Sequence, residues 1–76
     1  MTNKLQRVSA SETIRALEKA GYFLVRQSGS HRIYKNAEGR RVTVPYHSGK
    51  ELHLKILKSI LRDADLTTEE FLELMK

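Results

Sequence analysis

The chain of 76 residues contains no cysteine, which excludes disulfide bonds and thiolate zinc sites. A chain of this length has room for one small domain, which we expect to span residues 1–76, and such domains often rely on covalent or metal cross-links. Stability must therefore come from a partner or from packing of the apolar residues, which make up 39% of the chain. The lack of cysteine also fits a reducing compartment.

Long apolar runs are missing as well. No segment approaches the roughly 20 consecutive apolar residues that cross a membrane as a helix. The first five residues lack the apolar region of a signal peptide. The sequence also has no internal repeat and no low-complexity stretch. We therefore expect a soluble, cytoplasmic protein with no membrane segment.

Positive charge is what the chain has in excess, with a formal net charge of +5 and a pI of about 9.8. Residues 1–50 contain ten Lys and Arg against three Asp and Glu, a net of +7. Residues 51–76 contain four against six, a net of −2. The basic part is a candidate surface for a polyanion, most commonly nucleic acid. A solvated basic surface without a partner is the alternative.

Two helix starts carry a capping box, in which a hydroxyl residue precedes a glutamate by three positions. Ser9 and Glu12 predict a helix over about residues 9–20, and Thr67 and Glu70 open a short final helix. The first helix has the apolar residues Ala10, Ile14 and Leu17 at helical spacing, and we expect it to bury a stripe formed by Ile14 and Leu17.

A strongly amphipathic helix is predicted over about residues 52–62. Its apolar stripe consists of Leu54, Leu57 and Leu61, and we assign all three to the core. Ile56 and Ile60 widen the stripe.

Three segments rich in branched and aromatic residues predict strands at 22–26, 31–35 and 40–44. Turn residues separate them at 27–30 and 36–39, and Pro45 ends the last strand. The strands should form an antiparallel meander. The order α-β-β-β-α(-α) predicts a two-layer α+β domain, with an antiparallel three-stranded sheet and the helices on one face. The other face is then free for a partner.

The alternation of a strand divides the residues of the second strand between two faces. His31, Ile33 and Lys35 should share one face, and Arg32 and Tyr34 the other.

The tripeptide Gly29-Ser30-His31 stands between the first two strands, in the basic part of the chain. Imidazole can take up and release a proton near neutral pH, and Gly29 and Ser30 would support it as turn residues. A histidine in a strand is more often structural than catalytic, so both interpretations of His31 stay open. Nearby cations could stabilise charge on a phosphate and bind RNA: Arg26, Arg32, Lys35, Arg40 and Arg41.

These residues, in this order, resemble the HicA-type (YcfA-like) toxin family. The resemblance covers about residues 9–74, and its specific pieces are Gly-Ser-His at 29–31, Val-Thr-Val-Pro at 42–45 and Leu-Lys-Ser-Ile-Leu at 57–61. It implies a fold similar to double-stranded-RNA-binding domains, cleavage of mRNA, and inhibition by a HicB-type antitoxin. It also implies that His31 is the catalytic histidine. One position departs from the family pattern, because many members have a second histidine where Arg32 stands.

Three functions follow as alternatives. The first is a toxin that cleaves mRNA with His31 as general acid and base. Attack by the ribose 2′-hydroxyl requires no metal, and His47 and His53 offer too few ligands for one. The second is a non-catalytic RNA-binding module, and the third is an interaction domain that chiefly pairs with an antitoxin. We expect no cofactor, and we expect an antitoxin to cover residues 29–31.

Overall fold

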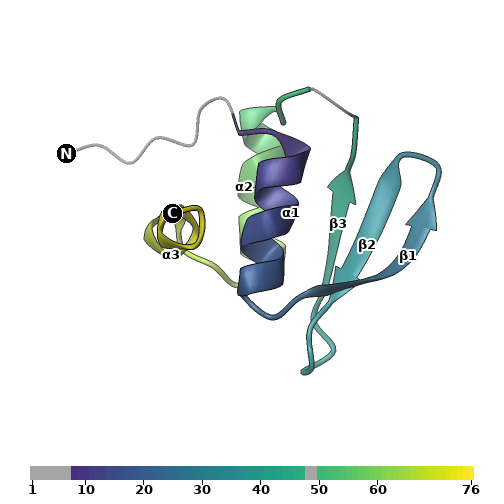
Figure 1. The fold of residues 1–76 in the computed structure, drawn as a ribbon, viewed down its shortest axis with the longest axis horizontal. Helices are drawn as coiled ribbons and strands as arrows, with labels where there is room; N and C mark the ends of the chain where they lie inside the picture. Colours follow the sequence, from purple (N-terminus) through teal and green to yellow (C-terminus); the bar gives the residue numbers. More distant parts are fainter. Residues whose placement is uncertain (1–7, 48–49) are drawn as a thin grey trace.

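The computed structural model describes residues 8–47 and 50–76 (Figure 1). The element order is α1 (Ala10–Lys19), β1 (Phe23–Ser28), β2 (His31–Lys35), β3 (Arg41–Pro45), α2 (Leu54–Ala64) and α3 (Thr68–Leu74). The strands form one antiparallel sheet in the order β1-β2-β3. The predicted α+β fold class and order of elements are confirmed. The N-terminal segment and part of the loop at 46–51 lie outside the described residues.

Both predicted capping boxes are present. The Ser9 hydroxyl accepts a hydrogen bond from the Glu12 backbone N–H at 3.1 Å, and the Glu12 carboxylate accepts one from the Ser9 N–H at 2.9 Å. Thr67 and Glu70 make the same pair of bonds at 3.0 and 2.9 Å. Each cap stabilises its helix by about 1 kcal/mol, and each places the start of its helix within a residue of the prediction.

All three helices lie on one side of the sheet, as predicted. α1 and α2 lie side by side against the sheet, and α3 packs on their far side (Figure 1). One apolar cluster fills the space between the sheet and the two helices, and its members are Ala10, Ile14, Leu17, Tyr22, Tyr34, Val42, Val44, Ile60 and Ala64. A second cluster joins the helices to one another and consists of Val8, Ala16, Leu57, Leu61 and Phe71.

α2 begins at Leu54, two residues later than predicted, because His53 takes the N-cap position. The His53 Nδ1 accepts a hydrogen bond from the Lys55 backbone N–H at 3.2 Å. The prediction that Leu54 belongs to the core is wrong, since Leu54 is 43% exposed and Ile56 is 42% exposed. Both residues lie in the first turn, ahead of the first buried position. The buried residues of α2 are Leu57, Ile60, Leu61 and Ala64.

β1 runs over Phe23–Ser28, displaced from the predicted strand at 22–26. Tyr22 precedes the strand. Its side chain is buried, and its hydroxyl donates a hydrogen bond to the Ala64 carbonyl at 2.9 Å. Burial raises the pKa of Tyr22 above its usual value of 10.0. At its other end the strand continues through Gln27 and Ser28, so only two residues remain for the turn to β2.

Candidate functional site

The turn between β1 and β2 consists of Gly29 and Ser30 alone, and Ser28 pairs directly with His31 across it. Gly29 has a φ of 58°, a conformation that L side chains rarely adopt. Glycine at the first position is the requirement of a two-residue type II′ hairpin turn. The sequence motif therefore has a local structural explanation, since the glycine permits the turn that starts β2 at His31.

The turn is held by two hydrogen bonds. The backbone N–H of Tyr46 donates to the Ser30 carbonyl at 2.6 Å, and the Gln27 side-chain amide donates to the Gly29 carbonyl at 3.3 Å. His31 pairs with Ser28 on one side and with Pro45 on the other, because β2 is the central strand. The backbone of His31 is therefore fixed from both neighbouring strands. The support from Tyr46 depends on the pairing of β2 with β3, so no local sequence signal reveals it.

The register of the sheet brings His31 and three cations to the face that points away from the helices. Tyr34, Val42 and Val44 are buried on the helix side, so alternate residues of β2 and β3 point outward. Pairing with β2 assigns the β1 residues in the same way. We call this surface the outer face, and it carries Phe23, Arg26, Ser28, His31, Ile33, Lys35, Arg41, Thr43 and Pro45. The alternation predicted for the second strand is confirmed.

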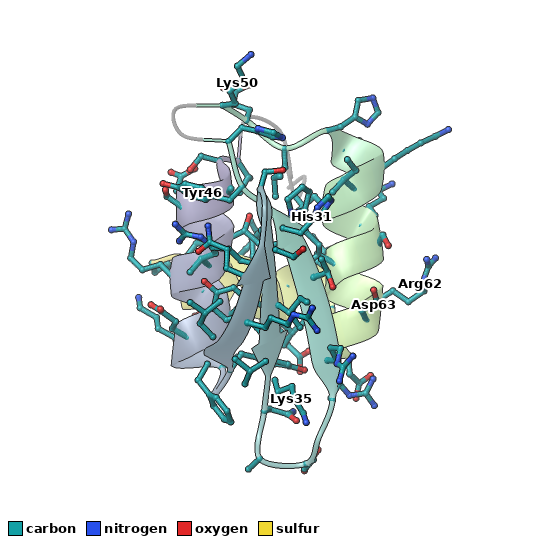
Figure 2. The ribbon with its side chains drawn as sticks, turned by 90° about the vertical axis from the view of Figure 1, so that its right-hand side faces the viewer. His31, Lys35, Tyr46, Lys50, Arg62 and Asp63 are labelled. Carbon is teal, nitrogen blue, oxygen red and sulfur yellow. The ribbon has the colours of Figure 1, made fainter. Side chains whose placement is uncertain are left out.

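The cations of the outer face lie at different distances from His31 along the sheet. Arg26 is opposite Ile33, one step of roughly 7 Å along the sheet from His31. Lys35 and Arg41 are opposite each other, two such steps away. Figure 2 looks onto the outer face, with His31 toward one end of the sheet and Lys35 toward the other. Within the three described strands no residue is acidic, so every charged side chain that they place on this face is positive.

Arg32, which follows His31, points to the helix side of the sheet. Its guanidinium carbon lies 3.9 Å from the centroid of the Tyr46 ring, a cation–π contact. Its Nε is buried, and no hydrogen-bond partner for that atom lies in the described part of the chain. Burial raises the pKa of the neighbouring Tyr34, and the adjacent Arg32 partly opposes that rise. The side chains of Arg32 and His31 therefore stand on opposite sides of the sheet.

Arg40 is also directed away from the outer face. It lies in the turn before β3, and one guanidinium nitrogen donates a hydrogen bond to the Asp63 carbonyl at 3.2 Å. Asp63 is in the last turn of α2, where exposed carbonyls attract a cation. Of the five predicted RNA-binding cations, Arg26, Lys35 and Arg41 share the face of His31.

The remaining histidines lie apart from this arrangement. His53 caps α2 through its Nδ1, and His47 is exposed in the segment after β3. Across residues 8–47 and 50–76 no group of three or more His, Asp or Glu side chains is arranged to hold a metal ion. None of the helices in those ranges has the length and apolar character that a membrane crossing requires.

Comparison with known proteins adds independent information. The family model for the HicA toxin of bacterial toxin–antitoxin systems matches residues 10–66. This range includes all of α1, the whole sheet and α2, and it ends before α3. None of the curated proteins searched matches the chain. Because the model covers most of the sequence, the chain belongs to the HicA toxin family, and it is the toxin domain of a bacterial toxin–antitoxin system that pairs with an antitoxin.

Proposed function

We propose that this toxin is an endoribonuclease that cleaves mRNA in the cytoplasm, with His31 as its general acid and base. The observation that supports it most is the exposure of His31 on the basic outer face, at the start of a central strand. An RNA backbone can approach this face because no helix of the described chain covers it (Figure 1).

The proposed reaction begins with neutral His31, whose imidazole takes the proton from a ribose 2′-hydroxyl. The 2′-oxygen attacks the adjacent phosphorus, and the bond from phosphorus to the 5′-oxygen breaks. The 5′-oxygen leaves with the proton that the His31 imidazolium gives up, which restores the neutral imidazole. The products are a 2′,3′-cyclic phosphate and a free 5′-hydroxyl. No step in this sequence requires a metal ion.

In this proposal Arg26, Lys35 and Arg41 hold the RNA and stabilise charge on its phosphates. Their common face and their spacing from His31 support that role. Arg32 and Arg40 already contact Tyr46 and Asp63, so the proposal assigns them to support of the fold. Gly29 and Ser30 support His31 by fixing the turn before it.

The antitoxin is proposed to be of the HicB type and to cover residues 29–31. An acidic inhibitor would associate quickly with the basic outer face, because opposite charges speed the encounter. A complex that leaves this turn exposed to solvent would contradict the proposal.

The test measures cleavage and binding of a single-stranded mRNA fragment by the purified toxin. We expect His31→Ala to slow cleavage by roughly 10²–10⁴-fold, the usual contribution of a general acid or base, while RNA affinity stays unchanged. His47→Ala is the matched control, since it removes a second exposed imidazole. An equal loss in that variant would make His47 the second proton-transfer group.

Two outcomes would favour the other functions. If the wild-type protein bound RNA and left it intact, the chain would be a non-catalytic RNA-binding module. If it neither bound nor cleaved RNA, the interaction domain that pairs with an antitoxin would remain. Induced expression should arrest growth only if the toxin is a nuclease, and His31→Ala should relieve the arrest.

A further inference from the structure

β1 differs from the other two strands because all six of its residues are exposed. Phe23, Leu24 and Val25 are consecutive apolar residues with exposed fractions of 52%, 48% and 44%. Phe23 lies on the outer face and Leu24 on the helix side, while Val25 is the extra residue of a β-bulge. Exposed apolar side chains that cluster on a surface are candidates for contact with another protein, and those of β1 point in more than one direction.

The backbone of β1 is also available along one edge. β1 is an outer strand of the sheet and pairs with β2 on its inner side. In the described part of the chain, the backbone hydrogen bonds of turns, loops and caps include none from Phe23–Ser28. Proteins usually protect such edges with charges or shorten them, and Arg26 is the single charged residue of β1. A strand of another chain can add to an edge of this kind.

We propose that the antitoxin binds this edge by adding a strand to β1. Its apolar side chains would pack against Phe23 and Val25, and an acidic side chain would pair with Arg26. Membership of a toxin–antitoxin family implies an antitoxin partner, whereas RNA cleavage is not needed for this proposal. The charge of the surface specifies an acidic partner, because Lys35 and Arg41 on the adjoining outer face are also positive.

A second copy of the toxin fits this edge less well than an acidic chain. It would bring Arg26 toward an equally basic surface, on a molecule with a formal net charge of +5. An antitoxin strand beside β1 would lie about 10 Å from β2, since neighbouring strands are separated by ~4.8 Å. From that position its side chains or adjoining segments reach His31, which pairs with Ser28 of β1. Binding at the edge would thus bring the antitoxin over the proposed active site.

The first experiment measures the affinity of purified toxin variants for a purified HicB-type antitoxin, the partner proposed above. Val25→Glu is compared with Ile56→Glu in α2, because the two parent side chains are apolar, β-branched and equally exposed, at 44% and 42%. We expect Val25→Glu to weaken binding by about tenfold or more, which corresponds to ~1.4 kcal/mol. Ile56→Glu should bind as the wild type does. Thermal unfolding followed by circular dichroism checks that both variants fold.

Amide hydrogen exchange distinguishes strand addition from burial of side chains alone. We expect the amides of Phe23–Ser28 to exchange more slowly in the complex. Unchanged exchange in β1, or wild-type affinity of Val25→Glu, would overturn the proposal. A dimer of the free toxin that Val25→Glu dissociates would also overturn it and assign the edge to a second copy. A wild-type toxin that fails to cleave RNA would refute the proposed ribonuclease and leave this binding test unaffected.

Discussion

β2 directs Tyr34 and Arg32 to one side of the sheet and His31 and Lys35 to the other. On the helix side, Tyr34 is 2% exposed and packs with Val42 and Val44. On the outer face His31 is exposed, and the surrounding strands carry only positive charges. Residues adjacent in the sequence therefore experience different environments, and their substitution should affect different properties of the protein.

The contrast is sharpest for the arginines. Arg32 and Arg40 contact the protein itself, through the Tyr46 ring and the Asp63 carbonyl. Arg26 and Arg41 are exposed on the outer face. A basic segment of sequence is therefore not a single binding surface, since the fold uses some of its cations for support and leaves the others in solvent.

The largest difference between the two sides should be in stability. We expect Tyr34→Ala to lower the free energy of unfolding by about 3–5 kcal/mol, as for other large aromatic side chains removed from a core. Thr43→Ala on the outer face should change it by less than about 0.5 kcal/mol. Urea unfolding followed by far-UV circular dichroism suits a chain without tryptophan. Similar losses in both variants would show that the two sides do not differ in packing.

The next difference should appear in the salt dependence of RNA affinity. Lys35→Ala and Arg41→Ala should each reduce the slope of log K against log salt by about 0.7, the value per phosphate contact on a single strand. Arg32→Ala should leave the slope unchanged and lower the free energy of unfolding by about 0.5–2 kcal/mol, because it loses the contact with Tyr46.

Arg40→Ala extends this comparison to the neighbour of Arg41. It should leave the slope unchanged, since Arg40 bonds to α2. A reduced slope in the Arg32 or Arg40 variant would show that the side chain reaches RNA.

The smallest expected effect is a loss of stability at alkaline pH, which depends only on residues of the buried, helix side of the sheet. Burial raises the pKa of Tyr22 and Tyr34 above 10.0, so the unfolded chain releases these protons at lower pH than the folded chain. Their contribution to stability is complete below pH 10 and is lost as pH rises through the higher pKa of the folded state.

Tyr22→Phe tests this dependence. At neutral pH it should lower the free energy of unfolding by about 0.5–1.5 kcal/mol, because the hydrogen bond to Ala64 is lost. Above pH 10 its stability should fall less steeply than that of the wild type. Unfolding measured from pH 8 to 11.5 gives both quantities, and equal slopes would contradict the assignment to Tyr22.

The helix starts could be predicted because the residues that define them lie only a few positions apart in the sequence. Ser9 and Thr67 define helix starts through bonds that span three residues. The prediction that Leu54 is buried is wrong, because helical spacing identifies the apolar stripe of a helix. The spacing does not show over which part of that stripe another element packs. The exposure of β1 was missed for a similar reason, since aromatic and branched residues favour a strand without specifying its place in the sheet.

The sequence by itself determined the order of elements, the Gly-Ser-His turn and the alternation along β2, because caps, turns and pleats depend on residues a few positions apart. Only the tertiary structure decided which arginines share a face with His31, which strand edge stays open, and that Tyr46 holds the turn. These features depend on register and packing between segments distant in the chain. They separate the cations that contact other parts of the protein from those that lie on the outer face beside His31.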